Sequence, residues 1–385
     1  MTAPCSAEFQ RVAAALGGID CDAHPVVTLR NPAGLDNWTL PVVEVLTVVG
    51  AALALAHAWR TYRRRGEPTN LALWVAALTY VLVLEPPLYF PDAFGLADRV
   101  GLVFVHNVFS VEFLYDRMPL YIVAIYPAGI YLAYTLVERI GVFARHGSVV
   151  GAVTVGFVHQ CFYEVFDNIG PQLRWWAWNP AAGTNEPSVG AVPLSSAFLF
   201  ATVGPFGATL LVRALISRRR GRRPGPVGLG ATAGWGVLAG LLTPLVLPLG
   251  GIPAGAAGLG STDAHTLQAA VLWGGIALFG VVAAWAMTTA VTTPGARPAV
   301  PADRFLALYP LAHGSAYLAT FALLWATALP DYLGAEAGVT DDGTPVGSLA
   351  YVIGCAAVCV AVVVLARPTA TPVEPAERSV TPVEA

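Results

Sequence analysis

Residues 148–180 read SVVGAVTVGFVHQCFYEVFDNIGPQLRWWAWNP, an apolar run that turns polar along one side before a group of tryptophans. The apolar part is long enough to cross a bilayer core, which takes about 20 helical residues. At 100° per residue, the polar side chains near its end fall within an arc of about 140°. They are His159, Gln160, Tyr163, Glu164 and Asp167. Because lipid does not tolerate such a face, we expect it to point into a helical bundle.

The composition is that of a polytopic membrane protein. The chain has 385 residues, of which 56% are hydrophobic and 12% are charged,. A net charge of −3 gives no sign of a nucleic-acid partner. All 21 basic residues are arginine, so no lysine Schiff base with retinal or pyridoxal phosphate forms,. The usage of Ala, Gly, Val and Arg is typical of GC-rich bacterial genomes, which makes a bacterial plasma membrane the expected location.

The apolar runs predict an all-α polytopic transmembrane bundle with about nine spans. They cover roughly 40–59, 69–88, 118–140, 148–168, 192–216, 227–249, 265–291, 305–329 and 348–366. Arginines cluster after the first, third and fifth spans, around 297–304 and at Arg367. All of these clusters fall on one side if the N-terminus is outside and the C-terminus is inside.

This topology divides the chain into five parts. Residues 1–39 form an extracytoplasmic tail, in which Cys5 and Cys21 fit either a disulfide or two free thiols,. Residues 40–216 form the half with the polar site, and 95–115 is expected to be an interfacial helix at the outer face. Residues 217–225 form a basic cytoplasmic loop, 226–366 complete the bundle, and 367–385 form a disordered cytoplasmic tail,.

Several acidic groups are expected at the same outer depth. Glu44 and Glu85 lie near the outer ends of the first two spans, level with Glu164 and Asp167. Three interpretations remain open. The first is a structural hydrogen-bonded network, and the second is metal-free acid/base catalysis by these carboxylates. The third is a site for a divalent metal such as Zn, Fe or Mn, with His159, His106 and Glu112 as ligands,.

The leading functional hypothesis is a membrane-embedded enzyme that acts on a lipid or isoprenoid in the outer half of the bilayer. Glu164 and Asp167 would be the acid/base pair, with Glu85 and Glu44 in support. An aromatic wall for the substrate is expected from Tyr163, Trp175, Trp176 and Trp178,. A proton- or cation-coupled transporter and a non-catalytic membrane subunit or assembly factor are the alternatives. Apart from membrane lipids, no partner is predicted. The transporter needs a polar path to the inner side, and residues 148–158 contain no ionisable group.

The stretch FDNIGPQLRWWAWNP resembles the signature of an uncharacterised family of polytopic membrane proteins, D-x-x-G followed by WWxW. Asp167 and Gly170 match its first part, and Trp175, Trp176 and Trp178 match its second. That family follows the tryptophans with a His-Asp pair, where this chain has Asn179 and Pro180. The DRMPLYI stretch at 116–122 is also similar to it. A weaker likeness is to membrane-embedded carotenoid-pathway cyclases and hydratases, which are also helical bundles with acidic residues beside Trp and Tyr.

Overall fold

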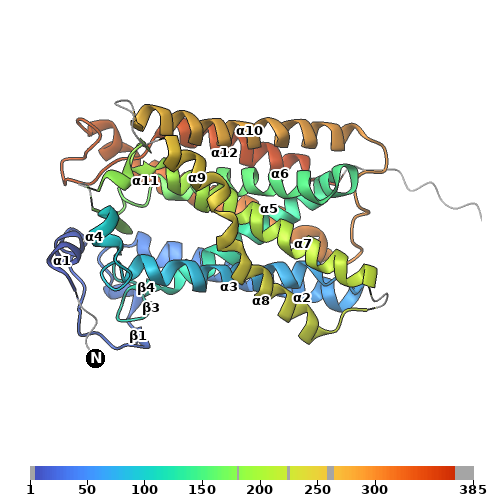
Figure 1. The fold of residues 1–385 in the computed structure, drawn as a ribbon, viewed down its shortest axis with the longest axis horizontal. Helices are drawn as coiled ribbons and strands as arrows, with labels where there is room; N and C mark the ends of the chain where they lie inside the picture. Colours follow the sequence, from blue (N-terminus) through green and yellow to red (C-terminus); the bar gives the residue numbers. More distant parts are fainter. Residues whose placement is uncertain (1–4, 180–181, 223–225, 258–263, 369–385) are drawn as a thin grey trace, which may run out of the picture.

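The computed structural model describes residues 5–179, 182–222, 226–257 and 264–368. Long helices lie side by side and make up most of the fold (Figure 1). The α-helices are α1 (Ala7–Ala14), α2 (Thr39–Arg65), α3 (Thr69–Tyr89), α4 (Leu96–Val100), α5 (Leu120–Ile140), α6 (Val142–Asp167), α7 (Gly204–Arg222), α8 (Leu229–Leu242), α9 (Pro248–Ala257), α10 (Ala264–Thr292), α11 (Arg304–Gly334) and α12 (Leu349–Leu365). A π-helix, η3 (Ser196–Val203), precedes α7, and short 3-10 turns cover Pro32–Gly34 (η1), Gly183–Asn185 (η2) and Thr243–Val246 (η4).

The predicted all-α class is confirmed. Among the described residues, seven helices are long and apolar enough to cross a membrane, with η3–α7 and α8–α9 each counted as one. The two remaining predicted spans coincide with α11 and with the shorter α12. The total of nine spans therefore stays a prediction. In α6, Gly147 has a φ of 79°, which glycine adopts without strain, so the straight part of the helix begins at Ser148,.

The outer helices expose apolar side chains, as a lipid-facing surface requires. Examples lie on α2, α8, α9, α10 and α12: Val45, Val49, Leu53, Leu241, Leu249, Leu278, Val281, Ile353 and Val360. In contrast, α5 is buried along nearly its whole length, between α2, α3 and α6. This inside-out distribution of apolar surface is compatible with an integral membrane protein.

Several arginines of α2, α5 and α6 gather at one end of the bundle, which we call the arginine-rich end. Arg60 and Arg64 both pair with Asp303, at 2.6 and 2.7 Å. Arg139 donates to the Ala307 carbonyl, and Arg145 donates to the Thr293 hydroxyl. These contacts bring together the ends of α2, α5 and α10 and the start of α11. The side of the membrane that this end faces stays a prediction.

The opposite end is covered by short strands, which we call the strand cap. Its strands are β1 (Val27–Leu29), β2 (Phe104–His106), β3 (Val111–Phe113), β4 (Met118–Pro119) and β5 (Trp176–Trp178). β3 pairs antiparallel with both β1 and β4, and β2 pairs antiparallel with β5. A separate hairpin joins β6 (Ser188–Val189) to β7 (Val192–Pro193).

The expectation of an interfacial helix over 95–115 is wrong for most of that segment. Only Leu96–Val100 is helical, and the rest contains β2 and β3 with the loops beside them. The reason is a partner far away in the sequence: β2 pairs with the tryptophan-containing strand β5, and β3 pairs with β1. Cross-strand aromatic and β-branched pairs stabilise such ladders, and apolar periodicity alone does not distinguish them from a helix.

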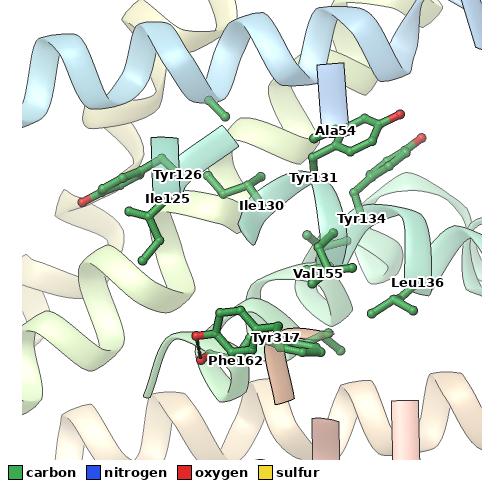
Figure 2. Close-up of a cluster of buried hydrophobic side chains, with 14 of the residues drawn as sticks. Ala54, Ile125, Tyr126, Ile130, Tyr131, Tyr134, Leu136, Val155, Phe162 and Tyr317 are labelled. Carbon is green, nitrogen blue, oxygen red and sulfur yellow. Dashed lines mark hydrogen bonds between the residues drawn. The ribbon is translucent and has the colours of Figure 1, made fainter. Parts of the chain in front are cut away.

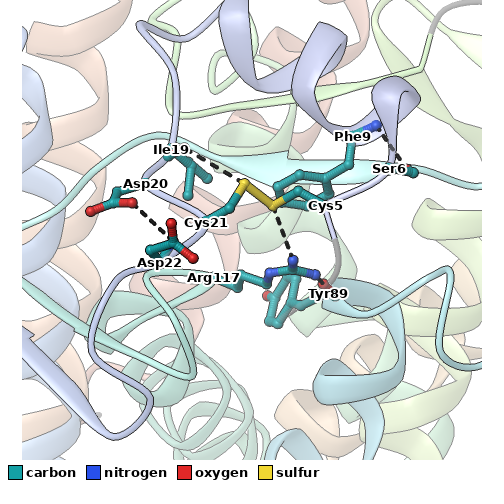
Figure 3. The surroundings of a disulfide bond; sticks show 9 residues. All are labelled: Cys5, Ser6, Phe9, Ile19, Asp20, Cys21, Asp22, Tyr89 and Arg117. Atoms are coloured by element: carbon teal, nitrogen blue, oxygen red, sulfur yellow. Dashed lines mark hydrogen bonds between the residues drawn. A yellow bond between two sulfur atoms is a disulfide. The ribbon is translucent and has the colours of Figure 1, made fainter. Parts of the chain in front are cut away.

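The N-terminal residues fasten the strand cap from outside. A disulfide joins Cys5 to Cys21 (Figure 3). The guanidinium of Arg117 lies 4.4 Å from the centre of the Phe9 ring and donates to the Tyr89 carbonyl at 2.8 Å. The apolar face of α1 also packs on Val103 and Val105. The predicted disordered tail lies beyond residue 368, outside the described residues. The predicted basic loop 217–225 begins within α7, which continues to Arg222.

Glu44 links the strand cap to the bundle, and its removal should loosen that junction. Its buried carboxylate accepts hydrogen bonds from the backbone N–H groups of Ser110 (3.2 Å) and Val111 (3.1 Å). Glu44→Ala leaves both donors without an acceptor, which should cost about 1–3 kcal/mol of unfolding free energy. Thermal unfolding followed by tryptophan fluorescence in detergent measures this loss. Glu44→Gln keeps one acceptor oxygen and should lose less. Equal midpoints for Glu44→Ala and wild type would contradict the role.

Candidate functional site

A cavity of about 270 Å³ lies beneath the strand cap. Its walls come from α3, α5, α6 and η3, and strands β2 and β5 contribute its cover. Most of the lining is apolar, and includes Leu88, Leu102, Phe104, Trp178, Leu199 and Phe200. The polar groups are few: Glu85, Tyr126, Tyr163, Asp167 and Ser196, with Asn185 and Ser195 at its edge. We call this space the acidic cavity. A mostly apolar pocket with a few convergent polar groups is the usual form of a ligand site.

Glu85 enters the acidic cavity from the last turns of α3. Its carboxylate is buried and accepts a hydrogen bond from the Tyr126 hydroxyl of α5 at 2.5 Å. Tyr126 points to the opposite side from Tyr131 and Tyr134, which belong to the same helix (Figure 2). The central helix α5 therefore presents hydroxyl groups in two directions, and only Tyr126 reaches the acidic cavity.

Asp167 enters from the end of α6 and accepts a hydrogen bond from the Ser196 hydroxyl at 3.5 Å. It belongs to a ridge with His159 and Tyr163, spaced four residues apart, so the three side chains lie above one another on one helix face. Tyr163 stacks on His159 with ring centroids 5.6 Å apart and lines the acidic cavity beside Asp167. This ridge faces the centre of the bundle.

The π-helix η3 completes the wall, and a proline explains one of its contacts. In an α-helix the Ala201 carbonyl would accept the N–H of residue 205, but that residue is Pro205 and has no N–H,. His159 Nδ1 bonds to this carbonyl at 2.7 Å instead. Since π-turns occur often at functional sites, the position of η3 beside two carboxylates is notable. The contact fixes both the His159 ring and the helix that carries Ser196.

Glu164 does not line the acidic cavity. It belongs to the neighbouring ridge of α6, with Gln160 and Asn168, and this ridge faces α12. Asn168 donates to one Glu164 oxygen at 2.8 Å, and Gln160 donates to the Tyr351 hydroxyl. The acidic cavity is therefore lined by Asp167 and Glu85, and Glu164 is not part of its lining. Glu44 lies in its contact with the strand cap, away from the acidic cavity.

The tryptophans of residues 175–178 have three different surroundings. Trp175 is buried, stacks on Phe166 at 5.6 Å and donates to the Thr39 hydroxyl at 2.8 Å. Trp176 is also buried, and its ring occupies the space that a side chain at Gly170 would need. Only Trp178 lines the acidic cavity. In the D-x-x-G…WWxW pattern, Asp167 and Trp178 therefore line the acidic cavity, while Gly170 leaves room for the Trp176 ring.

The three proposed metal ligands lie in separate places. His106 bonds to the hydroxyls of Tyr89 and Tyr121, both at 2.9 Å, and burial lowers its pKa to about 3. Glu112 contacts Arg30 at 2.6 Å, and His159 contacts Ala201. Within the described part of the chain, no group of three or more His, Cys, Asp or Glu side chains is arranged to hold a metal ion.

One side of the acidic cavity reaches the surface of the bundle. Leu88 of α3 and Leu199 and Phe200 of η3 line it and are only half-buried. These side chains belong to the apolar exterior that we assign to lipid.

Sequence reasoning missed Tyr126 and Ser196. Tyr126 belongs to a run of tyrosines within one apolar segment, at 121, 126, 131 and 134. Such repeated hydroxyls in a buried helix are a usable signal, because each needs a hydrogen-bond partner. Ser196 gave no comparable signal. Between β5 and the cavity-lining η3, the chain forms the 3-10 turn η2 and the β6–β7 hairpin.

A family model described as a domain of unknown function, DUF7802, matches residues 30–219. No curated protein and no solved structure matches the chain. The matched range contains the whole lining of the acidic cavity, from Glu85 to Phe200. It also contains strands β2 to β5, whereas α8 to α12 lie outside it.

In the strand cap, two carboxyl groups share one guanidinium, and this arrangement predicts how the stability of the fold depends on pH. Arg30 contacts both Glu112 and Asp116, so one positive charge faces two acids. Burial raises the pKa of Glu112 to about 9, against the opposing effect of Arg30. The folded state then holds a proton that the unfolded chain releases above its ordinary pKa of 4.5. The stability from this proton is full below pH 4.5 and decreases until the pH passes about 9,.

Glu112→Gln should remove that pH dependence, because the amide does not ionise. The wild-type unfolding free energy should fall relative to the variant by up to about 1.4 kcal/mol per pH unit between these two values. Thermal midpoints of both proteins across pH 4 to 10 measure the difference. Parallel curves would show that Glu112 has the same charge in both states.

Proposed function

We propose that the acidic cavity binds one end of an apolar lipid or isoprenoid molecule and performs acid/base chemistry on it. The observation that carries this proposal is that Glu85 and Asp167, from two different helices, line one mostly apolar cavity. Its volume of about 270 Å³ is near the lower end of the range for ligand pockets,. It therefore suits the end of a chain whose remainder lies in the surrounding hydrocarbon.

Two carboxyl groups at one apolar site can divide the roles of acid and base. One carboxylic acid transfers its proton to a carbon of an alkene; a C–H bond forms and the π bond breaks. The positive charge on the neighbouring carbon is stabilised by the rings of Tyr163 and Trp178, which line the same cavity,. The other carboxylate removes a proton from an adjacent carbon, or from a water that adds to the cation. The net results are isomerisation and hydration respectively.

The proposal includes the topology that the arginines favour. The arginine-rich end faces the cytoplasm of a bacterial cell, and the strand cap faces the outside. The disulfide between Cys5 and Cys21 fits an oxidising exterior,. With nine spans, the acidic cavity then lies in the outer half of the bilayer. We also keep as a proposal the resemblance of Asp167, Gly170 and the tryptophans to the signature of an uncharacterised family of polytopic membrane proteins.

The test compares carboxylate variants that differ only in whether the acid lines the cavity. Glu85→Gln and Asp167→Asn should lower the yield of a lipid product by about 100-fold or more, since each removes an acid/base group. Glu164→Gln is the matched control, because Glu164 is buried on the same helix but faces α12. Mass spectrometry of total lipids and pigments from expressing and non-expressing cells measures the products.

The control also decides what a loss means. A profile unchanged by Glu85→Gln and Asp167→Asn would overturn the proposal. An equal loss in Glu164→Gln would point to a general structural effect. As a binding test, Leu199→Trp should fill part of the cavity and reduce the lipid that copurifies with the protein in mild detergent.

A further inference from the structure

A second set of polar groups lies at the arginine-rich end of the bundle, outside the lining of the acidic cavity. A cavity of about 130 Å³ is lined there by His57, Asn70, Glu138 and Arg65. We call this space the inner cavity. Two of its lining residues, Arg65 and Val300, are exposed, so it opens to the surroundings. Glu138 also lines an adjacent space of about 320 Å³, together with Arg213. A carboxylate with access to water is thus present at this end.

Titratable side chains continue from the inner cavity into the centre of the bundle. His57 Nδ1 bonds to the Tyr131 hydroxyl at 2.7 Å, and its ring stacks on Tyr309 with centroids 4.6 Å apart. The Tyr309 hydroxyl in turn bonds to His313 Nδ1 at 3.1 Å. These residues come from α2, α5 and α11, and all of them are buried.

His313 then reaches a small cavity in the middle of the bundle, which we call the central cavity. It has a volume of about 20 Å³ and is lined by His313, His159, Tyr163, Tyr317 and Thr47. This volume is large enough for one water molecule, and the lining supplies polar groups of the kind that a buried water needs,. Tyr163 lines both this cavity and the acidic cavity, so it forms the wall between them.

Two glycines leave space beside the histidine nitrogens at the central cavity. A Cβ at Gly50 would lie 2.7 Å from His313 Nε2, and one at Gly129 would lie 3.2 Å from His159 Nε2. Neither Nε2 has a hydrogen-bond partner within the described part of the chain. Two buried imidazoles therefore present a free nitrogen towards the central region, where a larger residue would block it.

We propose that the bundle conducts protons between the arginine-rich end and the acidic cavity along His57, Tyr309, His313 and Tyr163. This activity goes beyond the proposed lipid chemistry and does not depend on it. It accounts for buried polar groups on α2 and α11 that the acidic cavity does not use. The apolar start of α6 is no obstacle, because the ionisable groups come from other helices.

Each step moves one proton, and each residue of the path returns to its original protonation state after it has passed a proton on. An imidazole takes a proton at one ring nitrogen and releases another from the second nitrogen. In His313, Nδ1 contacts the Tyr309 hydroxyl and Nε2 lies beside Gly50, and the side chain lines the central cavity, so the ring lies between successive members of the path. A water in the central cavity accepts the released proton and passes one to Tyr163. Both His57 nitrogens have partners, Nδ1 at the Tyr131 hydroxyl and Nε2 at the Leu306 carbonyl (3.3 Å), so the transfer between His57 and Tyr309 requires one of these side chains to rotate.

Flux into vesicles tests the proposal with the full-length protein. Liposomes that contain a trapped pH dye are given a potassium diffusion potential with valinomycin, and an uncoupler marks the maximum signal. The wild type should acidify or alkalinise the interior faster than protein-free liposomes. His313→Leu and Tyr309→Phe should lower this flux by about tenfold or more, equivalent to about 1.4 kcal/mol in barrier height. Tyr309→Phe keeps the ring that packs on His57, so it guards against a folding defect.

His146→Leu is the matched control, because His146 bonds to Thr289 and lies outside the path. It should conduct like the wild type. The proposal is overturned if wild-type flux equals that of protein-free liposomes, or if His313→Leu and Tyr309→Phe retain it. Loss of lipid product without loss of flux, in Glu85→Gln for example, would separate this activity from the proposed enzyme function.

Discussion

Hydrocarbon supplies no hydrogen-bond partners, and the arrangement of polar groups in this bundle follows from that constraint. The outer helices expose valine, leucine and isoleucine, whereas the carboxyl, imidazole and phenol groups turn to the centre. Buried polar groups are then stabilised by partners within the protein, several of them on another helix. The contacts between Glu85 and Tyr126, and between His57 and Tyr131, meet this requirement across α3–α5 and α2–α5. The same requirement holds polar groups in fixed geometry at the acidic cavity.

Pro205 shows how a local departure from the α-helix contributes to the site. By removing an N–H, it leaves the Ala201 carbonyl to accept from another group, and His159 supplies that group,. The bond fixes the imidazole so that its Nε2 faces Gly129 and the central cavity. The proline also lies two residues after the end of the π-helix, whose Ser196 contacts Asp167. One residue therefore influences both the wall of the acidic cavity and the orientation of a histidine in the central cavity.

The sequence predicted the helical class and the inward direction of the polar face of α6, because periodicity within one helix reports which side is buried. It did not predict that this face divides into two ridges. Positions 159, 163 and 167 face the centre, while 160, 164 and 168 face α12. Pairing Glu164 with Asp167 relied on their separation along the chain, but their neighbours come from distant segments. The strands at 104–113 were missed for the same reason, since their partners lie at 27–29 and 176–178.

The acidic cavity and the central cavity require different packing, because one is proposed to bind a hydrophobic chain and the other to conduct protons. A binding site for a hydrophobic chain needs apolar lining close to the surface of the bundle, which the half-buried Leu199 and Phe200 provide. A proton path needs the opposite: space for single waters only, since a wide channel would also admit ions. The central cavity of about 20 Å³ meets that condition, and Gly50 keeps the space beside His313 from closing. Tyr163 belongs to both regions, so its hydroxyl is where proton supply and cavity chemistry would meet.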